Sequence, residues 1–141
     1  LDSRTIQRVE TLVEYHDAVI PATPAAVRRW LNRLGEEDFR ALLAVKRADR
    51  AATRFTPEDF QELDRLGTLL DQTLAQRQCF SLKDLAVNGK DLLAEGYPPG
   101  KEMGWLLGQL LEQVLENPQL NQREALLARA CALWSNRPNT Q

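Results

Sequence analysis

Three side chains stand out as candidates for chemistry: the single histidine, His16, its neighbour Asp17, and Asp49. Histidine and aspartate bind divalent metals, but a metal site needs further ligands. The sequence has no HxxxH or HExxH motif and no adjacent acid cluster to supply them, so we expect no metal here. Asp49 continues the apolar face of a predicted helix, where an unpaired carboxylate is costly. An ion pair with Lys46 or a nearby arginine is the expected alternative to a ligand role.

A basic stripe is the second candidate. Arg40, Arg47 and Arg54 are spaced seven residues apart, so they fall near one face of a helix. Residues 28–54 hold eight basic and four acidic residues, a local net charge of +4. Such a stripe can bind the phosphates of a nucleic acid. A solvated face with ion pairs between successive turns explains the same pattern.

A glycine-rich helix start is the third candidate. Gly100 and Lys101 are placed where free backbone N–H groups and the helix dipole suit a phosphate. Gly100, Gly104 and Gly108 recur every four residues, although a glycine inside a helix costs about 1 kcal/mol relative to alanine. Either another helix packs against this bare strip or an RNA backbone approaches it. Trp105, off the core face, would stack on a ligand or cover a neighbouring helix.

The elements that must position these residues are helices. Apolar residues recur with helical period nearly throughout, and no segment alternates as a strand does. Thr-Pro pairs at 23–24 and 56–57 predict helix starts, Gly35 predicts a helix end, and Asn88 and Asn121 are predicted caps. The expected helices span about 3–17, 24–34, 36–52, 57–78 and 99–116, with a last one from about 121 and short pieces at 81–85 and 88–93. The fold class is therefore all-α, an irregular bundle of six to seven helices.

Composition narrows the function further. The 141 residues carry a net charge of −2, and no apolar run is long enough for a membrane span, so we expect no membrane association. Cys79 and Cys131 lie far apart without a CxxC motif, which favours a reducing cytoplasm. One histidine and no P-loop argue against self-sufficient catalysis. An amphipathic pattern begins almost at residue 1, which we interpret as the start of a C-terminal piece of a longer protein.

Two segments resemble a known family. Residues 82–93 (LKDLAVNGKDLL) and 96–104 (GYPPGKEMG), with the helix that follows, are similar to the C-terminal half of bacterial tRNA nucleotidyltransferases. These are the CCA-adding enzymes of the poly(A) polymerase-like class, in the branch that carries an HD domain. Residues 12–35 and 46–49 resemble the end of that HD domain. By this match Asp49 occupies the position of the final HD aspartate, and His16 and Asp17 lie on the preceding helix.

The resemblance implies a role without catalysis for this chain. It assigns residues 1–80 to the end of an HD-like helical domain and 81–141 to a helical tail that binds tRNA. In the family, Mg²⁺ with CTP and ATP is used by an N-terminal head that this chain lacks, so we expect no catalytic residue, no cofactor and no activity of the chain alone. Its helices would position tRNA for that head. The candidate RNA-binding residues are Lys83, Lys90, Gly100, Lys101 and Arg123, with Arg40, Arg47 and Arg54 as a second surface.

Two other functions stay open. The first is a remnant of an HD-type phosphohydrolase, which would require a metal. The second is a structural module that makes its parent a homodimer through Gly104, Gly108 and Trp105. The resemblance also does not separate enzymes that add the whole CCA from relatives that add only C, only A or poly(A).

Overall fold

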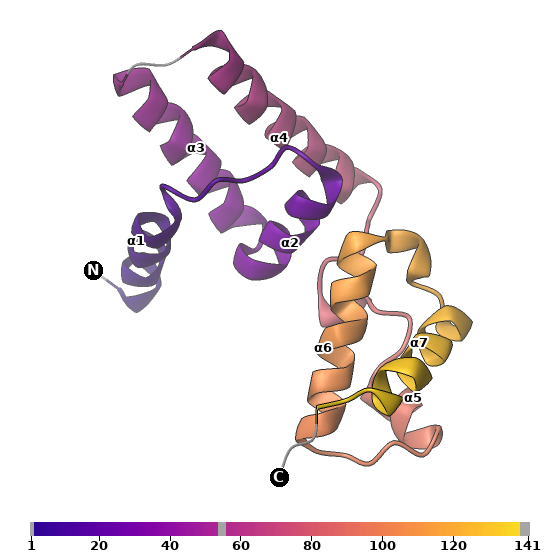
Figure 1. Cartoon of the computed structure of the whole chain (residues 1–141). Helices are drawn as coiled ribbons and strands as arrows, with labels where there is room; N and C mark the ends of the chain where they lie inside the picture. The colour runs from indigo at the N-terminus through magenta and orange to yellow at the C-terminus, as the bar shows by residue number, and fades with distance from the viewer. Residues whose placement is uncertain (1, 54–55, 139–141) are drawn as a thin grey trace. The chain divides into compact units, whose positions relative to one another are not determined.

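The computed structural model describes residues 2–53 and 56–138 (Figure 1). Within these ranges the chain forms seven α-helices and two short 3₁₀ helices, and no strand. The prediction of an all-α fold with six or seven helices is confirmed. The chain divides into two compact units, Leu1–Gln78 and Cys79–Gln141, which we call the N-terminal and the C-terminal unit. This division is close to the expected boundary at residue 80, while the assignment of the units to an HD-like domain and a tail stays a prediction.

The N-terminal unit contains four helices. They are α1 (Ser3–Tyr15), α2 (Pro24–Leu34), α3 (Glu36–Ala52) and α4 (Pro57–Ala75). Helix α2 packs against both α3 and α4, and α1 packs against α3. Helices α3 and α4 also pack against each other, so α3 contacts the three other helices of this small bundle.

Local signals in the sequence explain most of these boundaries. The Thr23 hydroxyl accepts a hydrogen bond from the Ala26 N–H at 3.2 Å, as an N-cap does. Gly35 has a φ of 82° between α2 and α3, a left-handed conformation that favours glycine. The prediction that α4 continues to residue 78 is wrong: Arg77 has a φ of 51°, and the Gln78 N–H donates to the Thr73 carbonyl at 3.2 Å. This Schellman motif ends α4 at Ala75.

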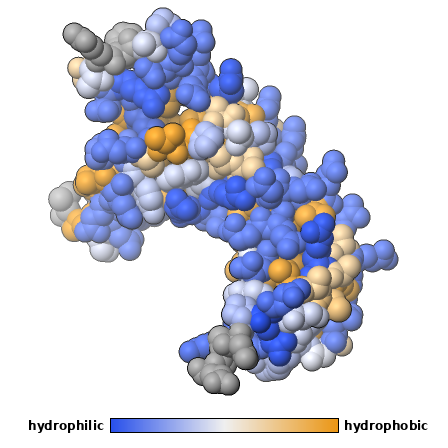
Figure 2. All heavy atoms as spheres, in the orientation of Figure 1, coloured by the Kyte–Doolittle hydropathy of each residue, from blue (hydrophilic) through white to orange (hydrophobic). Residues whose placement is uncertain are grey.

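The core of the N-terminal unit is formed by α2, α3 and α4, and α1 stays outside it. The fully buried side chains are Val27, Leu31, Phe39, Leu42 and Leu70. Helix α1 has no buried residue, and Ile6, Val9 and Val13 remain 44%, 54% and 64% exposed. Figure 2 shows hydrophobic patches among the hydrophilic surface of this unit. The expected amphipathic stripe exists, but the unit leaves much of it open to solvent.

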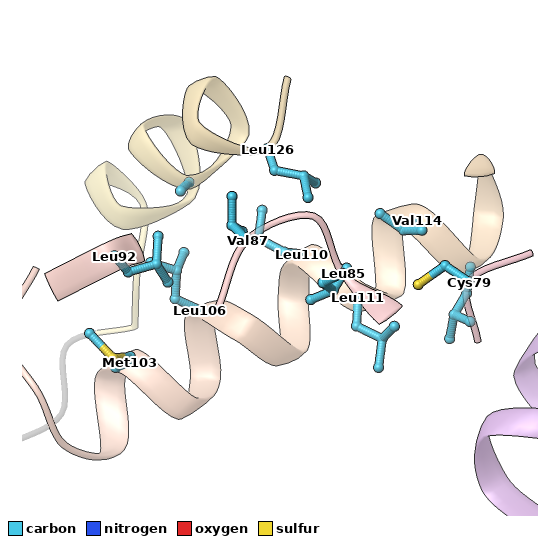
Figure 3. Close-up of a cluster of buried hydrophobic side chains, with 12 residues drawn as sticks. Cys79, Leu85, Val87, Leu92, Met103, Leu106, Leu110, Leu111, Val114 and Leu126 are labelled. Atoms are coloured by element: carbon cyan, nitrogen blue, oxygen red, sulfur yellow. The ribbon is translucent and has the colours of Figure 1, made fainter. Parts of the chain in front are cut away.

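The C-terminal unit is built around one long helix. Its elements are η1 (Leu82–Asp84), α5 (Gly89–Ala94), α6 (Lys101–Glu116), η2 (Pro118–Leu120) and α7 (Arg123–Ser135). Side chains of α5, α6, α7 and the segment before α5 point toward one another in a single cluster (Figure 3). Leu106, Leu110 and Val114 of α6 lie fully buried in it. Helix α6 is therefore the axis of this core, as its apolar period predicted.

Two asparagines fix the loops of the C-terminal unit. Asn88 caps α5, because its side chain accepts from the Asp91 N–H at 3.0 Å while Asp91 accepts from the Asn88 N–H at 2.9 Å. The predicted cap at Asn88 is confirmed. The predicted cap at Asn121 is wrong, since α7 begins at Arg123 with Gln122 at the cap position. The Asn121 amide instead accepts from the Ala86 N–H and donates to the Asp84 carbonyl, at 2.7 and 2.9 Å.

Candidate nucleic-acid interface

Two arginines of the basic stripe of the N-terminal unit, Arg40 and Arg47, are paired with acids. Arg40 donates to Asp71 of α4 at 2.7 Å and to Glu36 at 3.2 Å, and the Asp71 hydrogen bond raises the pKa of the guanidinium. Arg47 pairs with Asp64, also on α4. Arg54 lies outside the described residues. Arg40 and Arg47 therefore reach solvent as ion pairs, and an RNA-binding role for this stripe stays a prediction that the pairing does not favour.

Three lysines of the C-terminal unit are arranged differently. Lys83 lies in η1, Lys90 in the first turn of α5, and Lys101 is the first residue of α6; all three are exposed. In the described part of the chain, no ion pair joins any of them to an acid. The start of α5 packs on the first turn of α6, since a Cβ added to Gly89 would lie 3.5 Å from Met103 Sδ. This packing brings the segments that carry Lys90 and Lys101 close together.

Arg123, another candidate, is already engaged in the fold. Its Nη1 donates to Asp91 Oδ1 at 2.8 Å, which ties the start of α7 to α5. The Arg123 hydrogen bond, followed by that from the Asn88 backbone, holds the pKa of Asp91 below its ordinary value. Arg123 is therefore a structural link between two helices, and phosphate binding by it stays a prediction.

The glycine strip of α6 leaves room for side chains among the described residues of the C-terminal unit. A Cβ added to Gly104 or Gly108 would meet no other atom within 4 Å among the described residues. Both alternatives for the strip, packing by another helix and approach of an RNA backbone, stay predictions. Gly100 has a separate reason to be glycine, because its φ of 126° strains any other residue.

Beside this strip lies a hollow that the sequence did not indicate. It has a volume of about 260 Å³ and is lined by Lys101, Glu102, Trp105, Arg137 and Pro138. Arg137 Nε donates to Glu102 Oε2 at 2.9 Å, and its Nη1 donates to the Trp134 carbonyl at 2.8 Å. The residues after α7 are thereby held against the first turn of α6. In the sequence, Arg137 belonged to a polar, breaker-rich end and gave no signal of this role.

The residues matched to the HD domain form a small polar pair. His16 Nε2 lies 3.3 Å from Asp17 Oδ2, and its Nδ1 donates to the Val13 carbonyl at 2.6 Å. Asp49 borders the same shallow hollow as His16. Within residues 2–53 and 56–138, no three His, Cys, Asp or Glu side chains gather closely enough to hold a metal ion. His16, Asp17 and Asp49 therefore do not form a set of metal ligands in the described part of the chain.

At the C-terminal end of α3, the charged side chain that is buried is Lys46 and not Asp49. Asp49 is exposed, whereas Lys46 is only 5% exposed, so the expectation of a carboxylate at the buried end of the face is wrong. Lys46 Nζ donates to the His16 carbonyl at 3.2 Å and to the Ala18 carbonyl. Burial lowers the pKa of Lys46, with a further contribution from the Arg50 charge. This lysine holds the segment after α1 against α3.

Comparison with known proteins identifies the family of the chain. Residues 1–130 match the family model described as tRNA nucleotidyltransferase domain 2. The match covers most of the chain, so the protein belongs to this family. No curated protein and no solved structure matches the chain. None of the described helices is both long and apolar enough to cross a membrane.

Proposed function

We propose that this chain is the tRNA-binding helical part of a nucleotidyltransferase that adds CCA to tRNA 3′ ends. The supporting observation is a set of three exposed lysines that have no acidic partner among residues 2–53 and 56–138: Lys83, Lys90 and Lys101. They lie within the segment whose sequence resembles the CCA-adding enzymes. The chain acts by holding tRNA for a catalytic head and contributes no reacting group of its own.

The proposed mechanism is electrostatic and geometric. Double-helical RNA is recognised mostly through its phosphates and shape, and exposed lysines provide such contacts. Holding the outer part of a tRNA fixes where its 3′ end lies, which lowers the entropic part of the reaction barrier. The CTP, ATP and Mg²⁺ of the reaction belong to the head by this proposal, and this chain's residues are assigned to tRNA alone.

Fluorescence anisotropy tests the proposal with a folded tRNA and an unstructured RNA of equal length, at low and physiological salt. The chain should prefer the folded tRNA. Lys101→Glu should weaken binding several-fold and flatten the salt dependence, because each lost phosphate contact lowers the slope of log K against log salt by about 0.7–0.9. Arg65→Glu, an equal charge reversal at an exposed position of α4, is the matched control. An unchanged salt slope for Lys101→Glu would remove Lys101 from the contacts.

A dimerisation module is the second candidate function. The open strip at Gly104 and Gly108 favours it, because a bare helix face permits close approach of a second helix. Light scattering over a concentration series distinguishes the two functions. A mass that doubles with concentration, without any tRNA preference, would favour the dimerisation module.

A further inference from the structure

We propose that the hollow beside Trp105 takes the base of an unpaired nucleotide in a folded RNA, with the adjoining phosphate on Lys101. This inference rests on the proposed function only for the class of ligand, which is RNA. It adds a stacking contact to the phosphate contacts described above. It therefore predicts which RNAs the chain prefers, and not only that it binds them.

Trp105 differs from the other two tryptophans in what covers its ring. Trp30 packs edge-on against Tyr15 and stacks on Phe39, with ring centroids 5.2 and 6.4 Å away. Trp134 lies between Tyr97, at 5.2 Å, and the guanidinium of Arg137, at 4.3 Å. Trp105 is half-buried against the C-terminal core, and among the described residues no ring or guanidinium stacks on it. Its indole is available to a flat ligand.

The hollow has the size and wall chemistry for one base. At about 260 Å³ it lies just under the range of roughly 300–1,000 Å³ that holds most small-molecule ligands. Trp105 and Pro138 supply flat apolar walls on two different segments. The hydrogen bonds of Arg137 to Glu102 and to the Trp134 carbonyl hold the second wall in place. A purine or pyrimidine ring fits these walls, because aromatic side chains stack on any base.

The charges around the hollow favour a nucleotide over an uncharged ring. The Arg137 guanidinium is neutralised by Glu102, so the two together add no net charge. Lys101 has no acidic partner in the described ranges and lies one turn before Trp105 on the same face of α6. An aromatic ring joined to an anion complements an indole beside an ammonium. The unpaired nucleotide of an RNA has both parts in one residue.

Two RNA duplexes of equal length test this inference: one fully paired, and one with a single extra, looped-out 2-aminopurine nucleotide. The chain should bind the looped duplex about 5- to 150-fold more tightly, the range that stacking of one base on an aromatic side chain gives. Binding should also quench the 2-aminopurine fluorescence. Trp105→Ala should remove the preference and the quenching while binding to the paired duplex is kept.

Two further variants make the result interpretable. Trp105→Phe keeps an aromatic ring and should keep part of the preference, which protects the test against misfolding of the alanine variant. Leu93→Ala removes a side chain of α5 that is 47% exposed and lies outside the hollow, and it should leave the preference unchanged. Far-ultraviolet circular dichroism verifies the helix content of each variant.

The outcomes separate this inference from the function on which it rests. If Lys101→Glu weakens tRNA binding but Trp105→Ala, still folded, keeps the looped-base preference, the stacking site is wrong and the phosphate site stands. Equal binding of both duplexes by the unmodified chain overturns the stacking site as well. Concentration-dependent dimerisation that Trp105→Ala abolishes would assign the hollow to a second protein copy and overturn it too. No binding to any RNA overturns both proposals.

Discussion

In the N-terminal unit, Arg40 and Arg47 are paired with acids of α4 while the apolar face of α1 is left open. In the C-terminal unit the arrangement is reversed. Most apolar residues close into one core, although Leu82 and Leu93 stay exposed, and Lys83, Lys90 and Lys101 have no acidic partner among the described residues. Each unit thus leaves a different kind of surface available. The open lysines suit a polyanion, whereas the open face of α1 suits an apolar neighbour.

Local charge counts favour the N-terminal unit, whereas the ion pairs seen in the structure favour the C-terminal unit. Residues 28–54 hold eight basic and four acidic residues, whereas residues 79–141 hold six basic and seven acidic ones. Two of these basic residues, Arg40 and Arg47, form ion pairs with Asp71 and Asp64, which lie further along the chain on α4. Pairing in space, and not net charge along the sequence, decides which cations are available to phosphates.

The largest effect should come from the closed core. Leu110→Ala removes a fully buried side chain from the middle of α6 and should lower the free energy of unfolding by about 2–5 kcal/mol. Val13→Ala, at a position 64% exposed on α1, should change it by less than about 0.5 kcal/mol. Denaturant unfolding followed by circular dichroism measures both. Equal costs would mean that a second copy covers the α1 face in solution.

The next effect concerns the buried lysine. Lys46→Met should lower the free energy of unfolding by about 1–3 kcal/mol, because two backbone carbonyls lose a charged donor. In the folded chain the pKa of Lys46 lies below 10.5, the ordinary value for lysine. At pH values between the lowered pKa and 10.5, the unfolded chain therefore binds more protons than the folded chain. This lysine's contribution to stability therefore rises with pH across that window. Unfolding series at several alkaline pH values should show this rise in the original chain and its loss in Lys46→Met.

Breaking the arginine pairs tests the charge comparison directly. Asp64→Asn combined with Asp71→Asn removes the α4 partners of Arg47 and Arg40, leaves Arg40 with Glu36 alone, and keeps the size of both side chains. RNA affinity at low salt should rise several-fold, with a steeper salt dependence. Anisotropy titrations at several salt concentrations measure this. If the affinity does not change, pairing with α4 is not what withholds these arginines from RNA.

The smallest effect is expected at the link between α5 and α7. The Arg123 hydrogen bond lowers the pKa of Asp91 below the ordinary aspartate pKa of 3.8. The ionised Asp91 therefore stabilises the folded state at pH values above 3.8. This stabilisation is lost as the pH falls through the lowered pKa. Asp91→Asn should slightly lower the urea midpoint at neutral pH. The difference between the variant and the original chain should shrink in acid. A difference that grows in acid would contradict the assigned direction of the Asp91 pKa.

The sequence predicted those features that depend on neighbouring residues. The caps at Thr23 and Asn88 and the left-handed turn at Gly35 require only local hydrogen bonds and backbone preferences, and they appear where expected. The features that it missed join distant positions. Asn121 reaches back to Ala86 across 35 residues, and nothing near Asn121 distinguishes that role from a helix cap.

In the candidate site, too, the sequence predicted the local features and missed those that join distant residues. The sequence singled out Lys101 and Trp105, because a helix start and a residue off the core face are local patterns. It did not indicate the hollow beside them, since Arg137 reaches Glu102 across 35 residues. The Asp71 partner of Arg40 is 31 residues away for the same reason. Long-range partners follow from the packing of helices, which no local pattern specifies.

The burial of Lys46 has a practical consequence for chemical footprinting. The chain has four lysines, and three of them are the exposed Lys83, Lys90 and Lys101. An amine-directed acylating reagent will therefore modify lysines of the C-terminal unit and spare the one in the N-terminal unit. Mass spectrometry of the modified chain, with and without tRNA, reports which of the three becomes shielded. The unreacted Lys46 serves as the internal standard for an intact fold.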